Sequence, residues 1–463
     1  MTILQPGQHI HLIGIGGTGL SAIARVLLQR GYTVSGSDRN QGPLAAALVD
    51  VGATVYIGHD AAYVNGADVV LRSSAVPDDH VEVVAAREQG ILVVKRSDMI
   101  AELMAGQQAI CISGTHGKTT TTSMTAHTLI ASGQDPSYIV GGTLANTGTN
   151  AASGKGPAFV IEADEYDYMF LGLRPTIAVV NNVEWDHPDC FPTEQQFTQA
   201  FEKFVVLLPD DGILIAGADD GGAAALAQKR QQAGLPTITF GVQSEADWRA
   251  TDLHYDFDGR LTFSVDRFGE RLGEVSLGIS GEHNVLNALV ALIVADLQGV
   301  PFADASAALA QFKGAGRRFD VRDTVNEVVV VDDYAHHPTA IRKMIDVAHV
   351  RYPGHDVWAV WQPHTFSRTR ELFGEFVTAF DAADHVVVTA IYAARETAVP
   401  GVTGAVLVQA MQHPDAYYAP TFDDAVDHIF ANIQAPAVVV IMSAGDAPQI
   451  GIDLLARLES ASQ

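Results

Sequence analysis

One segment combines glycine, lysine and threonine in the order that binds the phosphates of a nucleoside triphosphate. It follows the apolar run 109–113 and reads Ser113-Gly114-Thr115-His116-Gly117-Lys118-Thr119-Thr120-Thr121-Thr122. Glycines allow a tight turn, the lysine reaches phosphate oxygens, and the hydroxyl after it can bind Mg²⁺. The full Walker form would place a glycine where this chain has Ile112, so we predict a shortened ATP-binding loop. The alternative is a threonine-rich helix start with a solvated lysine.

A second glycine loop follows the first apolar run of the chain, 9–13. It reads Gly14-Ile15-Gly16-Gly17-Thr18-Gly19, and Asp38 lies 19 residues beyond Gly19. Backbone N–H groups at a helix start can hold a pyrophosphate, and an acid at this spacing can bind a ribose. The pattern predicts a nucleotide diphosphate site. NAD binding fits the same pattern, and so do glycines that serve only strand–helix packing.

Acidic residues and a histidine follow two further apolar runs. Glu162, Asp164, Glu165 and Asp167 lie at the end of the run that starts at Phe159, and His187 follows the run 176–180. Because four neighbouring carboxylates repel one another, they indicate a bound Mg²⁺, with a solvated acidic turn as the alternative. His187 is predicted to bind a metal or to orient a phosphate oxygen.

Polar clusters further along the chain complete the candidate chemistry. Asn284 and Asn287 share one helix face and can match the edge of adenine, with helix capping as an equal alternative. Arg317-Arg318 can bind phosphate or serve only as solvated linker residues. The clusters 332–339 and 362–370 both follow apolar runs, and we expect them to form a lid over ATP and an amino-acid carboxylate.

Strands and helices that alternate along the chain must position these residues. The 463 residues suggest about three folding units, and two glycine loops imply two separate parallel sheets. A third alternating region begins after residue 315. The predicted fold is α/β with three domains: an N-terminal Rossmann-like domain (1–105), a central P-loop-type ATPase domain (106–315) and a C-terminal Rossmann-like domain (316–463).

The composition excludes several classes of protein. Hydrophobic residues make up 48% of the chain and charged residues 18%, which is typical of packed cores rather than disorder. The net charge of −26 makes a nucleic-acid-binding surface improbable. Cys111 and Cys190 form neither a disulfide scaffold nor a zinc motif, and the apolar stretch 285–297 is too short to cross a membrane. We therefore expect a cytoplasmic protein, either a monomer or a homodimer, with no membrane or nucleic-acid partner.

Six motifs, in order along nearly the whole chain, together resemble the Mur ligase family of peptidoglycan synthesis. They are Gly-Thr-His-Gly-Lys-Thr-Thr at 114–120, Glu-Ala-Asp-Glu at 162–165, Asp-His at 186–187, Gly-Glu-His-Asn-x-x-Asn at 281–287, Gly-Arg-Arg-Phe at 316–319 and Asp-Asp-Tyr-x-His-His-Pro at 332–338. The resemblance implies an ATP- and Mg²⁺-dependent ligase whose three domains bind a UDP-sugar, ATP and an amino acid. It is strongest to the members that join UDP-N-acetylmuramate to L-alanine.

The resemblance also implies roles for single residues. Lys118, His187 and Arg318 would be catalytic, and Thr119, Glu162 and His187 would hold the metal. The ATP-binding residues would be Gly114, Thr115, His116, Gly117, Lys118, Thr119, Thr120, Asn284, Asn287, Arg318 and Asp333. The UDP-sugar would contact Gly14, Gly16, Gly17, Thr18, Gly19, Asp38, His59, Ser73 and Ser74. The amino acid would contact Tyr334, His336, His364 and Arg368.

Two alternatives remain at this point. The members that attach a murein tripeptide to the same acid share the Glu-Ala-Asp-Glu-Tyr-Asp and Ala-His-His-Pro-Thr-Ala stretches. An NAD-dependent oxidoreductase would use only the first glycine loop. Tyr166, Trp185 and the segment 443–446 depart from the pattern expected of the alanine-adding members, which leaves the selection of the amine open.

Overall fold

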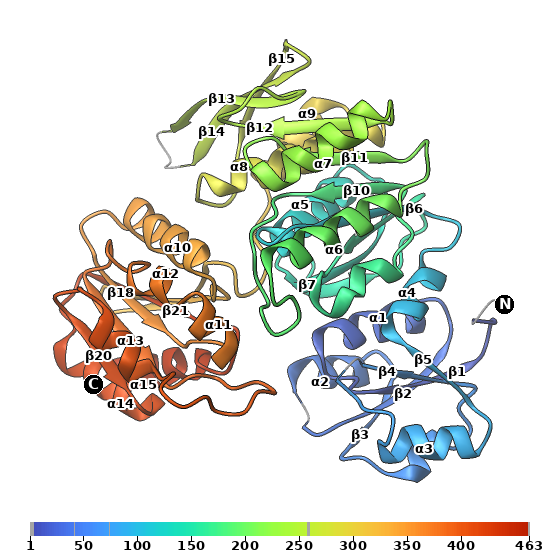
Figure 1. Ribbon diagram of the computed structural model, residues 1–463, viewed down its shortest axis with the longest axis horizontal. Coiled ribbons are helices and arrows are strands. Elements are labelled where there is room, and N and C mark those ends of the chain that lie inside the picture. Colours follow the sequence, from blue (N-terminus) through green and yellow to red (C-terminus); the bar gives the residue numbers. More distant parts are fainter. Residues whose placement is uncertain (1–3, 41, 74, 257–259, 462–463) are drawn as a thin grey trace.

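Three separate β-sheets organise the chain. The structure, a computed structural model, describes residues 4–40, 42–73, 75–256 and 260–461. Figure 1 shows the three α/β units along the sequence, with the C-terminal unit set to one side of the other two. None of the helices in these ranges combines the length and apolar character that crossing a bilayer requires.

The N-terminal sheet has five parallel strands in the order β3-β2-β1-β4-β5. Strand β1 matches the predicted run, and α1 ends one residue before the predicted Arg30. The strands are β1 (His9–Ile13), β2 (Thr33–Asp38), β3 (Thr54–Ile57), β4 (Val69–Arg72) and β5 (Leu92–Lys95). The helices are α1 (Thr18–Gln29), α2 (Pro43–Val49), η1 (Ala61–Val64), α3 (Val81–Glu88) and α4 (Arg96–Leu103).

The central sheet has ten strands in the order β15-β14-β13-β12-β11-β10-β6-β9-β7-β8. Its strands are β6 (Gln108–Ser113), β7 (Ser137–Leu144), β8 (Thr149–Ala152), β9 (Ala158–Glu162), β10 (Ile177–Val180), β11 (Ile213–Gly217), β12 (Thr237–Gly241), β13 (Trp248–Tyr255), β14 (Leu261–Arg267) and β15 (Glu270–Ser276). Its helices are α5 (Lys118–Ala131), η2 (Tyr166–Gly172), α6 (Glu194–Val206), α7 (Gly221–Gln232), α8 (His283–Leu297) and α9 (Phe302–Ala310).

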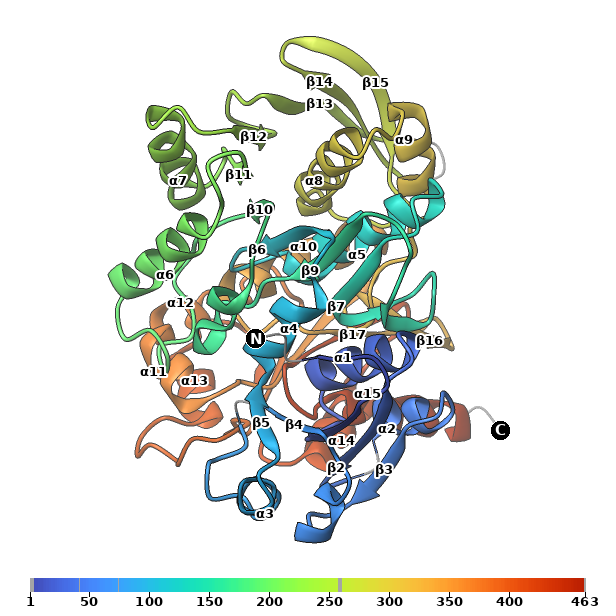
Figure 2. The ribbon, with the colours of Figure 1, turned by 90° about the vertical axis from the view of Figure 1, so that its right-hand side faces the viewer.

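The middle of this sheet positions the phosphate loop. Strands β9, β6 and β10 are parallel neighbours, so their carboxyl ends meet at one edge. The loop after β6, the acids after β9 and the segment 181–187 after β10 therefore lie together. The antiparallel strands β13–β15 extend the sheet at the end of the molecule opposite the N-terminal unit (Figures 1 and 2).

The C-terminal sheet has the order β16-β17-β21-β18-β19-β20, and only β16 is antiparallel to its neighbour. Its strands are β16 (Asp320–Val325), β17 (Val328–Asp333), β18 (Asp356–Trp361), β19 (His385–Thr389), β20 (Ala416–Ala419) and β21 (Ala437–Met442). Its helices are α10 (Pro338–Arg351), α11 (Phe366–Glu371), α12 (Phe373–Val377), α13 (Gly404–Ala410), α14 (Phe422–Asn432) and α15 (Pro448–Ala461). All six residues of β17 and of β21 are buried, as expected of parallel strands covered on both faces.

The N-terminal and central units share an apolar core, whereas the C-terminal unit has cores of its own. One cluster of buried side chains runs from the N-terminal sheet into the α6 side of the central sheet, so these two units share a core. The C-terminal sheet has two core clusters of its own, and Trp185 is the central-domain side chain that packs against one of them. The predicted boundary near residue 105 falls between α4 and β6, and the one near 315 falls just before β16. Both boundaries stay predictions.

Candidate active site

A cavity of about 1840 Å³ is lined by residues of all three units. The central unit contributes the phosphate loop, including Lys118, and the N-terminal unit contributes Thr18 and Gly19. The C-terminal unit contributes His364 and Arg368. The cavity therefore brings together residues that the sequence placed in three separate motifs.

The phosphate loop leaves little room for any side chain at its glycines. Gly114 has φ +139°, and a Cβ on it would lie 2.9 Å from the Cβ of Asn181. Gly117 has φ +80°, and a Cβ there would lie 2.6 Å from Oδ1 of Asn287. Gly117 directly precedes α5, so backbone N–H groups at the helix start face the cavity, as a phosphate site requires.

Lys118 is held by a buried acid rather than solvated. Its Nζ donates to the carboxylate of Glu165 at 2.8 Å and to the carbonyl oxygen of Gly114 at 2.7 Å. Glu165 is fully buried. Burial alone lowers the pKa of Lys118, but the attraction of Glu165, Asp164 and Glu162 outweighs it and raises the pKa. Lys118 is therefore charged, and the solvated-lysine alternative is wrong.

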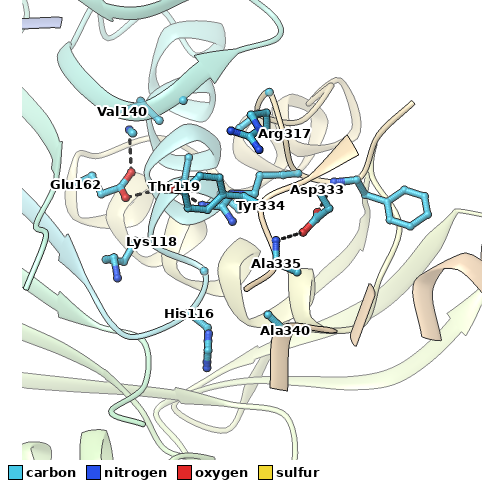
Figure 3. Close-up of a pocket in the computed structure, with 18 of the residues that line it drawn as sticks. His116, Lys118, Thr119, Val140, Glu162, Arg317, Asp333, Tyr334, Ala335 and Ala340 are labelled. Carbon is cyan, nitrogen blue, oxygen red and sulfur yellow. Dashed lines mark hydrogen bonds between the residues drawn. The ribbon is translucent and has the colours of Figure 1, made fainter. Parts of the chain in front are cut away.

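Glu162 and Thr119 place a carboxylate oxygen and a hydroxyl oxygen next to each other, near this lysine (Figure 3). Thr119 Oγ1 donates to Glu162 Oε1 at 3.1 Å, and the N–H of Gly141 donates to Glu162 Oε2 at 2.8 Å. Burial raises the pKa of Glu162 despite the nearby Lys118 and Arg318. A carboxylate and a hydroxyl are the ligand types that Mg²⁺ prefers, so this pair fits the predicted metal.

His187, the third predicted metal ligand, is held by other groups. Its Nε2 lies 3.6 Å from Glu165 and 3.7 Å from Asp186, and its Nδ1 accepts from Arg368 at 3.2 Å. Burial lowers the pKa of His187, but the carboxylates of Asp186 and Glu165 outweigh it and raise the pKa. Its role as a metal ligand stays a prediction.

A buried ion pair connects the central and C-terminal units. Arg368 Nε donates to Asp186 Oδ1 at 2.6 Å, and their side chains are 2% and 4% exposed. Arg368 Nη1 also donates to His364 at 3.0 Å. Burial raises the pKa of Asp186, but the charge of Arg368 outweighs it and holds the pKa well below its usual value.

A second polar connection crosses the same interface through Glu184. His116 Nε2, on the phosphate loop, lies 2.6 Å from Glu184 Oε2, and Thr339 Oγ1, on α10, donates to Glu184 Oε1 at 2.6 Å. Partial burial raises the pKa of Glu184, but the bonds from His116 and Thr339 outweigh it and lower the pKa to about 2. The phosphate loop is thus linked to the start of a C-terminal helix.

The predicted adenine residues join two helices of the central unit. Thr121 Oγ1 donates to Asn287 Oδ1 at 2.8 Å, and Asn287 Nδ2 donates to Asn284 Oδ1 at 3.0 Å. The capping residue of α8 is Glu282, which makes no side-chain cap bond, so the capping alternative for the asparagines is wrong. Both side chains line the cavity, and adenine contact stays a prediction.

Arg317 and Arg318 lie over one aromatic ring. Their Cζ atoms are 5.1 and 5.0 Å from the ring centre of Tyr334. Figure 3 shows Arg317 and Tyr334. Arg318 Nη2 donates to Thr119 Oγ1 at 3.1 Å, which brings it to the phosphate loop.

Asp333 accepts from the N–H groups of Phe319 and Ala335, and burial raises its pKa to about 6.

The remaining amino-acid candidates lie together on the C-terminal side. His336 Nδ1 is 2.8 Å from the carbonyl oxygen of Tyr334, and the rings of His336 and His364 are 6.0 Å apart. Tyr334, His336, His364 and Arg368 all line the cavity. The structure therefore groups these four residues as predicted, and their contact with an amino acid stays a prediction.

The N-terminal glycine loop is stabilised by its predicted acid. The N–H of Gly16 donates to Asp38 Oδ2 at 2.8 Å, and a Cβ on Gly16 would lie 2.9 Å from the same atom. Gly14 has φ +88° and packs beside Ser73, and Gly17 caps α1. Of the UDP-sugar candidates, Thr18 and Gly19 line the cavity, and Ser74 lies outside the described residues.

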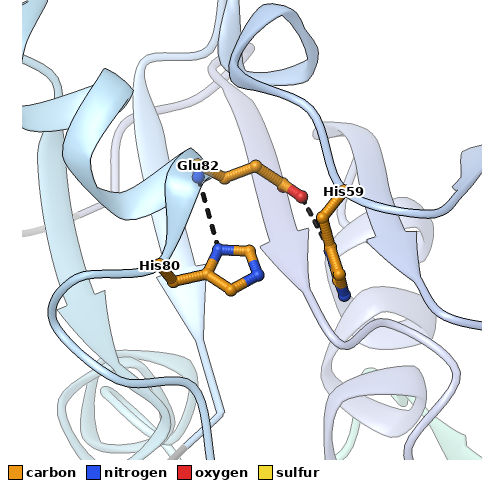
Figure 4. Close-up of side chains that lie close together, drawn as sticks. All are labelled: His59, His80 and Glu82. Atoms are coloured by element: carbon orange, nitrogen blue, oxygen red, sulfur yellow. Dashed lines mark hydrogen bonds and ion pairs between the residues drawn. The ribbon is translucent and has the colours of Figure 1, made fainter.

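His59 belongs to a polar cluster with Glu82 and His80 (Figure 4). Its Nδ1 lies 2.8 Å from Oε1 of the fully buried Glu82, whose Oε2 accepts from Ser37 and contacts His11, each at 2.8 Å. The ring of His80 meets that of His59 edge-on at 4.5 Å. Contact of His59 with a UDP-sugar stays a prediction.

Comparisons with known proteins identify the family of this chain. Three family models match in order: "Mur ligase family, catalytic domain" over residues 9–108, "Mur ligase middle domain" over 112–295 and "Mur ligase, glutamate ligase domain" over 317–445. A UDP-N-acetylmuramate–L-alanine ligase of Syntrophotalea carbinolica is 43% identical over 445 residues, 96% of each chain. The chain belongs to the Mur ligase family.

Solved structures of other Mur ligases share the three-domain arrangement. The UDP-N-acetylmuramate–alanine ligase of Thermotoga maritima superposes with a TM-score of 0.83 at 27% identity, covering 98% of this Mur ligase and 100% of that chain. A murein peptide ligase from Psychrobacter arcticus superposes with a TM-score of 0.73 at 28% identity, covering 98% and 99%. The predicted α/β fold with three domains is confirmed.

Sequence reasoning did not identify the partners of three acids in this Mur ligase. Glu165 pairs with Lys118, Glu184 pairs with His116, and Asp186 pairs with Arg368. All three follow strands β9 or β10, where the sequence already placed Glu162 and His187. The available signal was that these acids lie close in sequence to Glu162 and His187. The sequence could not name their partners, because Arg368, the partner of Asp186, lies 182 positions away.

A glycine substitution tests the shape of the phosphate loop in this Mur ligase. We expect Gly117→Ala to lower the free energy of unfolding by about 2–4 kcal/mol and to abolish ATP binding, because the left-handed backbone and the contact with Asn287 both oppose a Cβ. Gly133→Ala is the matched control, since Gly133 has φ +76° and open space around it. It should cost about 1–2 kcal/mol and leave ATP binding intact. Equal losses of stability in urea titrations would contradict this prediction.

Buried histidines predict a loss of stability in mild acid. Burial lowers the pKa of His283, His336 and His337 to about 4 and that of His364 to about 3. Because the unfolded chain binds these four protons near pH 6.5, their stabilisation is present above that pH and is lost as pH falls toward 4.

Asp333 has the opposite effect on stability as pH falls. Because its pKa is raised to about 6, the folded state binds a proton on Asp333 at a higher pH than the unfolded chain does. Among these five groups alone the unfolded chain binds about three protons more, so they lower stability by up to about 4 kcal/mol per pH unit between pH 6 and 5. Thermal unfolding at pH 7, 6 and 5 measures this, and His364→Gln should reduce the slope. Stability that is constant or rises over this range would contradict the prediction.

Proposed function

We propose that this Mur ligase joins the carboxylate of UDP-N-acetylmuramate to the amine of L-alanine at the expense of ATP. The observation that carries the proposal is the single cavity in which Lys118, the N-terminal glycine-loop residues Thr18 and Gly19, and Arg368 meet. The 43% identity to a UDP-N-acetylmuramate–L-alanine ligase along nearly the whole chain supports it. In this scheme residues 1–105 bind the UDP-sugar, 106–315 bind ATP and 316–463 bind the amino acid.

The chemistry follows from charge. A carboxylate is a poor electrophile, so it first attacks the γ-phosphorus of ATP and forms an acyl phosphate, with ADP as the leaving group. This step brings two anions together, and charged groups fixed beforehand lower its barrier. Lys118 is held in its charged form by Glu165, and Arg318 reaches the same loop through Thr119. Both cations would neutralise the oxygens of the transferred phosphoryl group.

Mg²⁺ belongs to this proposal through the oxygens of Thr119 and Glu162. Their 3.1 Å contact and the burial of Glu162 fit a hard cation, which supplies further neutralisation of phosphate charge when bound. His187 would orient a phosphate oxygen or join the ligands after release from Asp186. The loop residues Gly114, Thr115, His116, Gly117 and Thr120 would hold the phosphates, Asn284 and Asn287 the adenine, and Asp333 the ribose.

The second step requires a closed site. The neutral amine of alanine attacks the acyl carbon, and collapse of the tetrahedral intermediate expels phosphate, which takes up the proton that the nitrogen loses. Water would hydrolyse the acyl phosphate, so the C-terminal unit must cover the site before the first step. The bonds of Asp186 and Glu184 to that unit hold such a cover in place. We place the enzyme in the cytoplasm, because its two free cysteines suit a reducing compartment.

Phosphate release tests the proposal. The purified protein with ATP, Mg²⁺ and UDP-N-acetylmuramate should release phosphate only when L-alanine is added, and mass spectrometry should detect the amide product. ATP hydrolysis that does not depend on an amine would indicate an ATP-switched binding protein instead. Turnover of NAD(P)H without phosphate release would indicate an oxidoreductase.

A second candidate is attachment of a murein tripeptide to the same acid. The structural likeness to the Psychrobacter arcticus murein peptide ligase, at 28% identity, is the observation that favours it. Competition among L-alanine, glycine, L-serine and the tripeptide in one reaction, read by the masses of the products, distinguishes the two functions. A predominance of the tripeptide product would reject L-alanine as the substrate.

A further inference from the structure

Two histidines and a buried carboxylate lie together in the N-terminal unit. His59 follows β3, His80 caps the start of α3, and Glu82 lies in the first turn of that helix. One atom from each residue, a ring nitrogen or a carboxylate oxygen, lies within 4.8 Å of the other two. None of the three residues lines the large cavity that contains the phosphate loop. The cluster is therefore separate from that cavity, and its chemistry has to be explained on its own.

The spacing of these three side chains suits a single cation. His59 Nδ1 lies 2.8 Å from Glu82 Oε1, and the rings of His59 and His80 meet edge-on with their centres 4.5 Å apart (Figure 4). In a tetrahedral zinc site, bonds of about 2.0–2.2 Å place neighbouring ligand atoms roughly 3.3–3.6 Å from one another. The distances in the cluster lie on both sides of this range. Small rotations of the two imidazole rings are therefore enough to surround one ion.

The carboxylate of Glu82 is buried without a permanent counter-charge. Its side chain is fully buried, and its ion-pair partners are the histidines His11 and His59. Among the residues that the structure describes, no lysine or arginine forms an ion pair with it. Burying a carboxylate is costly unless a charge compensates it, and a histidine supplies that charge only when it is protonated. A divalent cation beside Glu82 would supply it with both histidines neutral.

A further set of hydrogen bonds orients Glu82 as a ligand. Ser37 Oγ donates to Glu82 Oε2 at 2.8 Å, and His11 Nε2 lies 2.8 Å from the same oxygen. His11 is held in turn by Ser35, whose Oγ lies 2.8 Å from His11 Nδ1. Metal ligands in proteins are oriented by outer partners of this kind, which here leave Oε1 facing His59. The side chain of His59 is 23% exposed, so an ion can enter from solvent.

The donor atoms determine the kind of cation. Two imidazole nitrogens and one carboxylate oxygen suit Zn²⁺, Co²⁺ or Ni²⁺, whereas Mg²⁺ and Ca²⁺ prefer oxygen ligands. Three protein ligands leave the fourth position of a tetrahedral site for water. The ion would connect segments that follow β3 and β4, two strands that β2 and β1 separate in the sheet. Such a connection stabilises the N-terminal unit.

We propose that His59, His80 and Glu82 form a binding site for one divalent transition-metal ion of the zinc type. The ion takes the place of the hydrogen bond between His59 and Glu82. A proton on the binding nitrogen leaves to solvent, because imidazole and carboxylate bind metals in their deprotonated forms. This inference does not depend on the proposed function, since no step of ligation passes through the ion.

Titration with Co²⁺ tests the site, because Co²⁺ accepts the same ligands as Zn²⁺ and its visible absorption reports tetrahedral coordination. The metal-free, full-length protein is titrated in excess Mg²⁺, which occupies oxygen ligands such as those of the phosphate loop. His80→Asn removes one ligand, and asparagine can still cap α3. We expect this variant to lose one equivalent of Co²⁺, with binding weakened at least about 100-fold, because loss of an outer partner alone costs about 10- to 100-fold.

Two further measurements separate metal binding from damage to the fold. Glu82→Gln keeps the size of the side chain and should lose the same equivalent of Co²⁺. Saturating Zn²⁺ should raise the midpoint temperature of unfolding of the wild type but not that of His80→Asn. X-ray absorption of the zinc-loaded wild type should show imidazole nitrogens at about 2.0–2.1 Å from the metal.

His116→Asn is the matched control, because His116, Glu184 and His337 form the other cluster of this kind in the described parts of the chain. It should retain the equivalent of Co²⁺ that His80→Asn loses. The proposal is wrong if the wild type binds no Co²⁺ under these conditions. It is also wrong if His80→Asn and Glu82→Gln bind as many equivalents as the wild type with equal affinity, since His59 then serves only to hydrogen-bond the buried carboxylate. A lack of ligation with L-alanine would reject the proposed function and leave this site standing.

Discussion

Replacing Lys118 with alanine is expected to lower L-alanine-dependent phosphate release at least about 1000-fold while the UDP-sugar still binds. A fixed cation at a transferring phosphoryl group contributes this much when water is excluded. Lys118 is 14% exposed and bound to Glu165, so no solvent cation replaces it readily. Phosphate release measures the first effect, and titration calorimetry with UDP-N-acetylmuramate measures the second.

A loss of folding has to be separated from a loss of chemistry in this variant. Lys118→Ala leaves the fully buried Glu165 without its main counter-charge, which costs about 3–5 kcal/mol of stability. Adding Glu165→Gln removes that charge, so the double variant should regain stability without regaining activity. Lys229→Ala, at an exposed pair with Glu202, should change neither quantity.

Retention of a tenth of the activity by Lys118→Ala would overturn the phosphate-loop assignment. Equal loss of UDP-sugar binding in the folded double variant would overturn the domain assignment.

Local hydrophobic pattern explains which strands were predictable. Strands such as β17 and β21 are buried on both faces, and their runs of valine appear directly in the sequence. Strand β7 was not predicted, because Gly141 and Gly142 interrupt it and read as a turn. A Cβ on Gly141 would lie 2.5 Å from Glu162, so glycine there serves the site rather than the strand. The hairpins β13–β15 alternate between buried and exposed residues too irregularly for a sequence pattern to reveal.

In the candidate site, too, the residues of local motifs were predictable, and contacts between distant residues were not. Lys118 and Thr119 were predicted from the glycine–lysine–threonine motif in the loop after β6, and Glu162 because it ends the apolar strand β9. The parallel order β9-β6-β10 brings them together. The pairs Asp186–Arg368 and Glu184–Thr339 were not predicted, since they join residues 182 and 155 positions apart across two units. Such contacts depend on how two separately folded units pack against each other. The spacing of residues in a single sequence does not indicate which surfaces will meet.

These cross-domain pairs lead to a prediction about closure. We expect Asp186→Asn to release the C-terminal unit and to lower kcat/KM for L-alanine by about 100- to 1000-fold. The substitution leaves Arg368 buried without its counter-charge, which costs about 3–5 kcal/mol in the docked state. The C-terminal sheet has its own core clusters, so the cost falls on docking rather than on folding of that unit.

Small-angle scattering and kinetics together distinguish loss of docking from local damage. The radius of gyration of Asp186→Asn should exceed that of the wild type, while the unfolding of the C-terminal unit should be unchanged. Adding Arg368→Met removes the stranded charge, so the double variant should return toward the compact form but stay inactive, because Arg368 also orients His187 and His364. Glu371→Gln, which breaks an exposed pair on α11, is the control and should change neither measurement. An unchanged radius of gyration in Asp186→Asn would mean that apolar contacts such as that of Trp185 hold the two units together, and the buried ion pair would then serve only to position His187.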